Sequence, residues 1–239
     1  RSWSSAKRTI QAAIDAAASG DTVFILEGVY AQAISLKSGV HVFGGYSAAS
    51  YARDVDAYPT VLDGSELAKH LVASGSCSVT TYVDGLVLQN ANHSMDGGGA
   101  SLKSNCVLNR CTITGCYTTG KGGGVYNAGG VVSNCVIELC ESLGAGGAVY
   151  NTSSGLVENT VIRGCKGNYA AIRNENEAIV RNCLLHNNEP SGSDWPNSGG
   201  IYNPSGVVYN NTLACNFGSQ YGGFHSDNIA YNNLMWNNH

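Results

Sequence analysis

The amino-acid sequence predicts an all-β fold, a right-handed parallel β-helix in which short coils stack so that each adds one strand to long parallel sheets. From residue 97 onward one segment recurs about every two dozen residues, and a second segment recurs in step with it. Charged residues make up only 13% of the 239 residues, whereas 31 residues are Gly. Repetition at a fixed period indicates a solenoid, and a weakly charged chain rich in turn residues is typical of an all-β protein.

The start of the chain is expected to form a cap. Residues 9–20 predict a short amphipathic helix that ends at a glycine, and such a helix would cover the open end of the first coil. Its apolar residues fall on one helical face: Ile10, Ala13, Ile14 and Ala17. Strands are expected next, at residues 22–26, 33–36 and 40–43.

The chain is interpreted as a single β-helix domain over residues 1–239. It comprises a cap-helix region (1–21), irregular first coils (22–96) and regular repeats (97–239). An insertion rich in Pro and Gly at 189–196 predicts a protruding loop. The last residues break off inside a coil, so a further domain or a partner is expected to cover that end.

The first recurring segment predicts one strand in each regular coil. Its copies begin at Gly99, Gly124, Ala148, Ala171, Gly200 and Gly223. Because side chains alternate along a strand, one column points inward: Val125, Val149, Ile172, Ile201 and Phe224. The neighbouring column points outward: Tyr126, Tyr150, Arg173, Tyr202 and His225. The next residue is expected at a corner, in the left-handed conformation that Asn tolerates and bonded to its equivalents: Asn127, Asn151, Asn174 and Asn203.

The second recurring segment reads Asn-Cys-Val-Ile at residues 134–137 and predicts another strand in each coil. Paired apolar residues just before it, such as those at 131–132, predict a third. Three short strands separated by corners make one β-helix coil. The Asn of this segment is expected at a second corner of stacked amides: Asn134, Asn159, Asn182, Asn210 and Asn232.

The nine cysteines fall partly into two inward columns. One column contains Cys111, Cys135 and Cys183, and the other contains Cys116, Cys140 and Cys165. Stacked coils lie about 4.8 Å apart, so a disulfide such as Cys116 to Cys140 is within geometric reach. Thr or Asn replaces Cys in other coils of these columns, which favours small, free, buried thiols instead. No CxxC motif or His-containing cluster has zinc spacing, so neither a metal nor a cofactor is expected.

Two parts of the chain resemble known families. The segments at 9–14, 20–23, 28–30, 44–46 and 60–64 resemble the start of secreted bacterial right-handed β-helix repeat proteins in the pectin-lyase-like superfamily. The later Gly-Gly-x-Val/Ile-Tyr-Asn units are similar to the repeats of polymorphic outer-membrane proteins, which are autotransported adhesins. The resemblance implies this fold and an extracellular or bacterial cell-surface location. Because the superfamily includes lyases, hydrolases, epimerases and adhesins, it leaves the activity open.

Two classes of partner are not expected. The net charge is −4 and no basic cluster is present, so the electrostatic footprint of a nucleic-acid-binding protein is missing. No run of 18 or more apolar residues is present, so no segment of this chain is expected to insert into a membrane.

The outward column of the first segment is the predicted ligand-binding surface. Tyr126, Tyr150 and Tyr202 would form a flat platform on which sugar rings stack, while Arg173 and His225 would supply hydrogen bonds. Trp195, in the inserted loop, is expected to contribute to this surface. The alternative interpretation is a tyrosine ladder that only stiffens the sheet.

A catalytic interpretation rests on other outward residues. Arg163 and His186 lie on consecutive coils and, together with Arg173 and Glu175, could bind and deprotonate an acidic sugar. Opposite charges also alternate along these columns, as in Glu138 and Arg163 or Glu158 and Arg181, which equally predicts surface ion pairs of small energy.

The sequence therefore predicts a non-catalytic extracellular or cell-surface β-helix module that binds carbohydrate or acts as an adhesin. Its partner would be a polysaccharide or a cell-surface glycan. One alternative is a polysaccharide lyase or related enzyme acting on acidic glycans, and another is a purely structural stalk.

Overall fold

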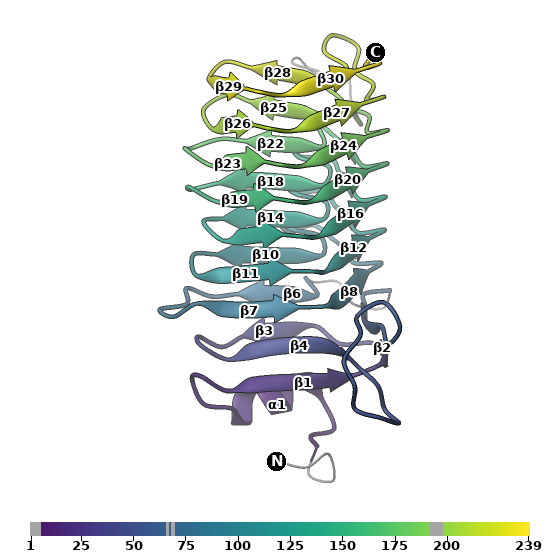
Figure 1. The fold of residues 1–239 in the computed structure, drawn as a ribbon, viewed down its shortest axis with the longest axis vertical. Helices are drawn as coiled ribbons and strands as arrows, with labels where there is room; N and C mark the ends of the chain where they lie inside the picture. The colour runs from purple at the N-terminus through teal and green to yellow at the C-terminus, as the bar shows by residue number, and fades with distance from the viewer. Residues whose placement is uncertain (1–5, 66, 68–69, 192–197) are drawn as a thin grey trace.

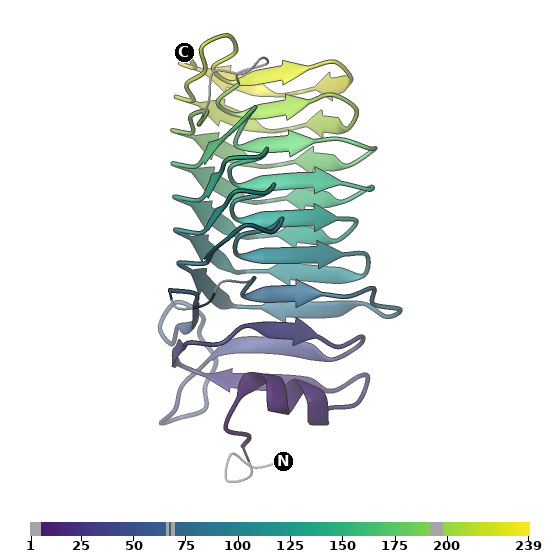
Figure 2. The same ribbon diagram turned by 180° about the vertical axis from the view of Figure 1, so that it is seen from behind.

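The chain is a right-handed parallel β-helix, as the sequence predicts. The computed structural model describes residues 6–65, 67, 70–191 and 198–239. The coils stack into a column with helix α1 at one end and strands β28 to β30 at the other (Figure 1). Figure 2 shows the column from behind. Three long parallel sheets run its length, and a short fourth sheet, which the sequence did not predict, accompanies them in the middle coils.

The four sheets are named A to D. Sheet A consists of β1 (Thr22–Leu26), β4 (His41–Tyr46), β7 (Thr81–Asp84), β11 (Cys106–Asn109), β15 (Val131–Ser133), β19 (Leu156–Glu158), β23 (Ile179–Arg181), β26 (Val207–Tyr209) and β29 (Ile229–Tyr231). Sheet B consists of β2 (Gly28–Tyr30), β5 (Thr60–Asp63), β8 (Leu86–Gln89), β12 (Thr112–Thr114), β16 (Val136–Glu138), β20 (Val161–Arg163), β24 (Leu184–His186), β27 (Thr212–Ala214) and β30 (Leu234–Trp236).

Sheets C and D carry the remaining strands. Sheet C consists of β3 (Ile34–Leu36), β6 (Val72–Ser74), β10 (Ala100–Lys103), β14 (Val125–Ala128), β18 (Val149–Thr152), β22 (Ile172–Asn174), β25 (Ile201–Asn203) and β28 (Phe224–Ser226). Sheet D consists of β9 (Asn92–His93), β13 (Tyr117–Thr118), β17 (Glu141–Ser142) and β21 (Lys166–Gly167). In the middle coils the chain passes through sheets A, B and D before it enters sheet C in the coil above.

Helix α1 (Ile10–Ala16) is the predicted cap and is shorter than expected. Thr9 caps its first turn, since its hydroxyl accepts a hydrogen bond from the backbone N–H of Ala12 at 3.1 Å. Ile10 and Ile14 are buried against the first coil. The helix ends before Gly20 because Ala17 already has an extended backbone, with φ −79° and ψ 150°.

The predicted inward column of sheet C is confirmed over four coils and forms part of the core. Val125, Val149, Ile172 and Ile201 are fully buried, and only Phe224, in the last described coil, is partly exposed. Burying one such side chain contributes about 1.5–3 kcal/mol. Repetition of the same apolar position in every coil therefore stabilises the stack along its whole length.

The two Asn columns turn out to differ. The expected left-handed corner is wrong for Asn127, Asn151, Asn174 and Asn203, which lie inside the strands of sheet C and point into the core, fully buried. Their side chains form the expected stack, with Nδ2 of one Asn donating to Oδ1 of the next at 2.8 to 2.9 Å. The second column does adopt the left-handed conformation, with φ between 49° and 57°: Asn134, Asn159, Asn182, Asn210 and Asn232. A buried amide needs partners, whereas a solvated corner needs a residue that tolerates positive φ.

The Gly-Gly pairs before strands β10, β14 and β18 are required by the turn out of sheet D. Gly122 has φ +71°, a conformation that side chains with a Cβ rarely adopt. Gly123 lies so close to the next coil that a Cβ atom there would be 2.2 Å from the carbonyl oxygen of Gly147. This turn recurs in the coils above and carries the connections that cover the outer face of sheet C.

Candidate functional site

The predicted outward column of sheet C exists in register. Tyr126, Tyr150, Arg173, Tyr202 and His225 are direct partners on consecutive strands. The rings of Tyr126 and Tyr150 stack with centroids 5.5 Å apart and planes 8° apart, and those of Tyr202 and His225 stack at 5.2 Å and 5°. Arg173 interrupts the aromatic column at its centre.

The column is not the exposed platform that the sequence suggested. Tyr150 is only 4% exposed and Tyr202 only 8%. The connections that enter sheet C place other side chains against the column. The ammonium group of Lys121 lies 4.5 Å from the centroid of the Tyr150 ring, and the ring of Tyr169 lies 6.2 Å from that of Tyr202. Ligands can therefore reach the buried tyrosines only where this covering layer leaves a gap.

Tyr169 occupies a glycine position. It precedes Ile172 by three residues, as Gly146 precedes Val149, and these two strand residues are register partners. The φ angle of Tyr169 is 75°, close to the +71° of Gly122 and Gly146. A side chain in this left-handed conformation costs about 1–2 kcal/mol, and such strain concentrates at functional sites. The sequence analysis missed Tyr169, although an aromatic residue in a glycine column was a usable signal.

Arg173 is held by charge and by aromatic faces. Its Nε atom donates to Oε2 of Glu175 at 2.8 Å, and its guanidinium carbon lies 5.0 Å from the ring centroid of Tyr169 and 5.1 Å from that of Tyr202. The hydroxyl of Tyr150 donates to the other oxygen of Glu175. These contacts hold the Arg173 side chain between two aromatic rings and a carboxylate.

The ionisation of this group follows from its burial and hydrogen bonds. Burial favours the neutral form of Glu175, but the hydrogen bonds from Tyr150 and Arg173 outweigh it and lower the pKa of the carboxyl group. Burial, reinforced by the hydrogen bond to Glu175, raises the pKa of the Tyr150 hydroxyl. Glu175 is therefore a carboxylate and Tyr150 a neutral phenol at neutral pH.

A pocket of about 350 Å³ opens between the covering connections at this point. Its lining combines tyrosine rings, basic side chains and a polar amide: Lys121, Leu143, Gly144, Ala145, Tyr150, Asn168, Tyr169 and Arg173. Lys121 Nζ donates to the Tyr150 hydroxyl at 3.2 Å, and within the described part of the chain no carboxylate is ion-paired with it. The charged residues that line the pocket are thus Lys121 and Arg173, and of these Arg173 is paired with Glu175.

The other predicted catalytic residues are not part of this pocket. Arg163 and His186 are register partners on sheet B, whereas Arg173 lies on sheet C, and sheet D intervenes along the coil. The expected grouping of these three residues is wrong because the chain turns twice between Arg163 and Arg173. Arg163 forms an ion pair with Glu138 at 2.6 Å, with its side chain 51% exposed. Trp195 lies outside the described residues.

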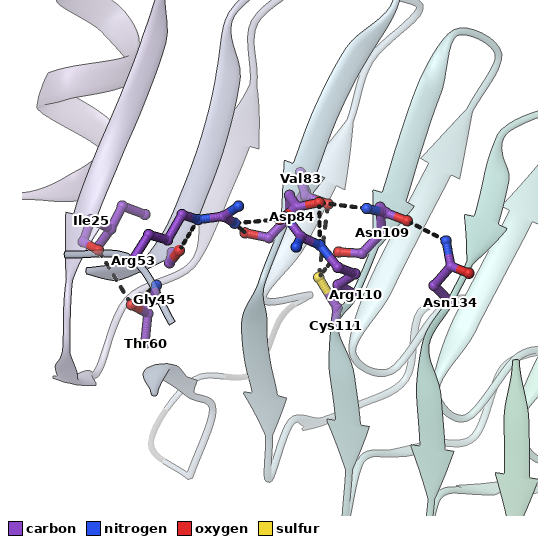
Figure 3. Close-up of polar contacts among 11 residues, drawn as sticks. Ile25, Gly45, Arg53, Thr60, Val83, Asp84, Asn109, Arg110, Cys111 and Asn134 are labelled. Atoms are coloured by element: carbon purple, nitrogen blue, oxygen red, sulfur yellow. Dashed lines mark hydrogen bonds and ion pairs between the residues drawn. The ribbon is translucent and has the colours of Figure 1, made fainter. Parts of the chain in front are cut away.

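A second polar cluster, which the sequence analysis did not identify, joins the first coils (Figure 3). Asp84 accepts hydrogen bonds from Arg53, Asn109 and Arg110, and its side chain is 6% exposed. Burial works to raise the pKa of Asp84, but these hydrogen bonds lower it overall. Arg53 also donates to the carbonyl of Gly44 at 2.9 Å. Because Arg53 bonds both Gly44 in β4 and Asp84 in β7, the cluster holds the segment around Arg53 against sheet A.

Among the described residues, no group of three or more His, Cys, Asp or Glu side chains could hold a metal ion. The same part of the chain contains no helix that is long and apolar enough to cross a membrane.

Comparison with known proteins finds similarity at the level of structure. No protein-family model matches the chain, and no curated protein matches it. Two structures of the pectin methylesterase from Aspergillus niger are similar to this chain. The alignment with the first covers 97% of this chain and 81% of the esterase, at 16% sequence identity and a TM-score of 0.57. The alignment with the second covers 95% of this chain and 82% of the esterase, at 15% sequence identity and a TM-score of 0.58. The alignment with a pectin methylesterase in complex with a hexasaccharide covers 98% of this chain and 79% of the esterase, at 13% sequence identity and a TM-score of 0.54. At these identities the similarity shows a shared fold, the parallel β-helix.

Proposed function

We propose that this chain is a carbohydrate-binding module that recognises an acidic polysaccharide in the pocket on sheet C. The observation that carries the proposal is the composition of that pocket, in which Lys121 and Arg173 lie beside the rings of Tyr150 and Tyr169. Tyrosine rings pack against the apolar faces of sugars. Lysine and arginine form charge-assisted hydrogen bonds with carboxylates. Together they fit a sugar that carries a carboxylate.

Two further facts support a saccharide ligand. The volume of about 350 Å³ lies at the small end of the range for ligand pockets, which suits one or two sugar units of a longer chain. The structurally similar proteins are pectin methylesterases, one of them in complex with a hexasaccharide. The location that goes with this function is extracellular or at a bacterial cell surface, where the module would bind polysaccharide or adhere to a glycan. Surface biotinylation of intact cells tests that location.

The charge of Lys121 gives the sharpest test. Isothermal titration calorimetry would compare oligogalacturonate with the same oligomer fully methyl-esterified, which removes the negative charge. We expect the charged oligomer to bind more tightly than the esterified one. Lys121→Gln should weaken the affinity for the charged oligomer roughly tenfold, which corresponds to a loss of about 1.4 kcal/mol of binding free energy. Lys103→Gln, at the far end of strand β10, changes the net charge equally and serves as the control. An equal loss of affinity in both variants, or the same affinity for the charged and the esterified oligomer, would contradict the proposal.

Tyr169 gives a test that is independent of charge. Tyr169→Gly installs the residue found at this position in other coils, so the variant is expected to fold. It removes one ring from the pocket and frees one side of Arg173. We expect weaker binding of oligogalacturonate with an unchanged far-ultraviolet circular dichroism spectrum. Unchanged affinity would place the ligand elsewhere.

A second candidate function is catalysis on an acidic glycan, as in a polysaccharide lyase or a related enzyme. The observation that favours it is the contact of Glu175 with Tyr150 and Arg173 beside the pocket. Unsaturated sugars released from polygalacturonate, or methanol released from pectin, would support it if Glu175→Gln abolished the activity. A blank result in both the binding and the activity assays would favour a structural stalk.

A further inference from the structure

Two cysteines outside the proposed site lie sulfur to sulfur. Cys77 Sγ and Cys106 Sγ are 3.3 Å apart, and the two residues are 6% and 0% exposed. Both are free thiols in the structure. We infer that Cys77 and Cys106 are a specific oxidation site, at which a disulfide oxidant such as oxidised glutathione converts the two thiols into one disulfide.

The thiols of the two cysteine columns are oriented differently. Cys135 Sγ lies 3.2 Å from the carbonyl oxygen of Ser133 and 3.5 Å from that of Leu108, one coil below. The same pair of contacts, to the carbonyl two residues back and to one in the coil below, recurs along both columns: Cys111, Cys116, Cys140, Cys165 and Cys183. Each of these thiols therefore has backbone acceptors in place. Cys106 Sγ instead has the Cys77 thiol at 3.3 Å, alongside contacts with the hydroxyl of Ser74 and the backbone of Lys103.

The backbone around Cys77 is held on both sides. Cys77 lies in the connection between β6 and β7, and Cys106 begins β11, one coil above. From above, Asn105 Nδ2 donates to the carbonyl of Cys77 at 2.8 Å. From below, the hydroxyl of Ser38 accepts a hydrogen bond from the backbone N–H of Ser78 at 3.0 Å. To reach a disulfide length of about 2.05 Å, the sulfur atoms, now 3.3 Å apart, need to approach by only roughly 1.3 Å.

The order of the two steps follows from access. Cys77 is flanked by the exposed residues Ser76 and Ser78, so it meets the oxidant first. Its thiolate attacks one sulfur of oxidised glutathione, forms a mixed disulfide and releases one glutathione thiolate. The Cys106 thiolate then attacks Cys77 Sγ and releases the second glutathione. Two protons leave the protein, two cysteine thiols are oxidised and one glutathione disulfide is reduced.

The second step is expected to be slow at neutral pH. Burial raises the pKa of Cys106 to about 11, so only a small fraction of this thiol is ionised near pH 7. The rate of ring closure should therefore increase with pH over the alkaline range. The finished bond would join residues that are 29 positions apart in the sequence and lie on adjacent coils. Such a crosslink is expected to raise the melting temperature by roughly 5–10 °C.

Peptide mapping tests the inference directly. The folded full-length chain would be equilibrated with oxidised glutathione at pH 9, its free thiols alkylated in denaturant, and trypsin digestion done without reduction. Trypsin separates the two cysteines into peptides 70–103 and 104–110. We expect these peptides to be joined, and the melting temperature of the oxidised chain to fall on reduction. Cys106→Ser should abolish the joined peptide, whereas Cys116→Ser should leave it intact.

Two outcomes would overturn the inference. One is recovery of both peptides in alkylated form after equilibration, which means that the thiols stay reduced. Another is a disulfide between other cysteines, such as Cys116 and Cys140, in place of this one. Because the wild-type map decides between these results, the inference stays testable even if a serine variant fails to fold.

Discussion

The buried asparagine column of sheet C makes an unequal contribution to stability along its length. Asn151 is an interior member: its Oδ1 accepts from Asn127 and its Nδ2 donates to Asn174, both at 2.8 Å. Asn127 is the first member, because its partner in the coil below is Leu102. Among the described residues Asn127 Oδ1 has no hydrogen-bond partner. Replacing the two asparagines by alanine therefore removes different numbers of amide contacts.

The magnitudes follow from the groups that each substitution leaves without a partner. Each substitution leaves one amide oxygen without its donor, Oδ1 of Asn174 in Asn151→Ala and Oδ1 of Asn151 in Asn127→Ala. Asn151→Ala also removes the hydrogen bond from Asn127, whose Nδ2 keeps the carbonyl oxygens of Gly130 and Leu156 as acceptors. A buried polar group that loses its partner costs about 1–3 kcal/mol. This cost is common to both variants, so Asn151→Ala should destabilise the chain more than Asn127→Ala by the net value of one further hydrogen bond, about 1 kcal/mol. The bonds from each Nδ2 to backbone carbonyls are lost equally in both variants and cancel in the comparison.

Urea unfolding, followed by circular dichroism, measures this difference. Both residues are fully buried and the substitution is the same, so the loss of packing is matched. We expect Asn151→Ala to have the lower midpoint, by an amount equivalent to about 1 kcal/mol. Equal midpoints, or a lower midpoint for Asn127→Ala, would refute the ladder as the reason for asparagine at these positions.

Three further predictions test individual features of the scaffold. Leu139 has a left-handed backbone, with φ 55°, and its side chain is 66% exposed. Asn tolerates this conformation better than Leu, so Leu139→Asn should raise the free energy of unfolding, measured in urea, by about 1 kcal/mol. A lower free energy of unfolding would contradict this. Arg53→Ala removes one guanidinium group from the buried carboxylate of Asp84, so it should lower the free energy of unfolding by about 1.5–3 kcal/mol. Arg163→Ala removes an exposed ion pair, so it should lower the free energy of unfolding by less than about 1 kcal/mol in the same urea measurement. Hydrogen bonds from Ser65 lower the pKa of Asp63 to about 2, so the stability this carboxylate contributes is present above about pH 4 and is lost as the pH falls toward 2. Asp63→Asn should therefore flatten the decline of the thermal midpoint between pH 4 and pH 2, and an unchanged slope would contradict this.

Most of the scaffold could be predicted because its determinants recur in every coil. The inward column that contains Val125 and Val149 follows from alternation alone, and the left-handed corner at Asn134 follows from the conformational tolerance of Asn. The corner expected at Asn127 was wrong because the same residue type serves two purposes. Local sequence does not distinguish a solvated turn from a buried amide that finds its partner one coil away.

The candidate site was predicted less well because it depends on contacts between connections. Alternation predicts that Tyr150 points outward, and it does, but outward is not exposed when Lys121 and the neighbouring connection lie over it. In the same way, Arg163 and Arg173 look like neighbours in the sequence but lie on different sheets. The pairing of Cys77 with Cys106 was missed because Cys77 lies in a connection outside the repeat.

The proposed site lies where one coil departs from the repeat twice. Tyr169 stands at a glycine position and Arg173 at a tyrosine position, and the two side chains contact each other. Neither change benefits a scaffold, since the first introduces backbone strain and the second interrupts a ring stack. Restoring the pattern with Tyr169→Gly and Arg173→Tyr should therefore abolish detectable binding of oligogalacturonate while the chain stays folded. Calorimetry on this double variant checks the prediction, with circular dichroism as the control for folding. Retained affinity would show that the two departures have no part in recognition.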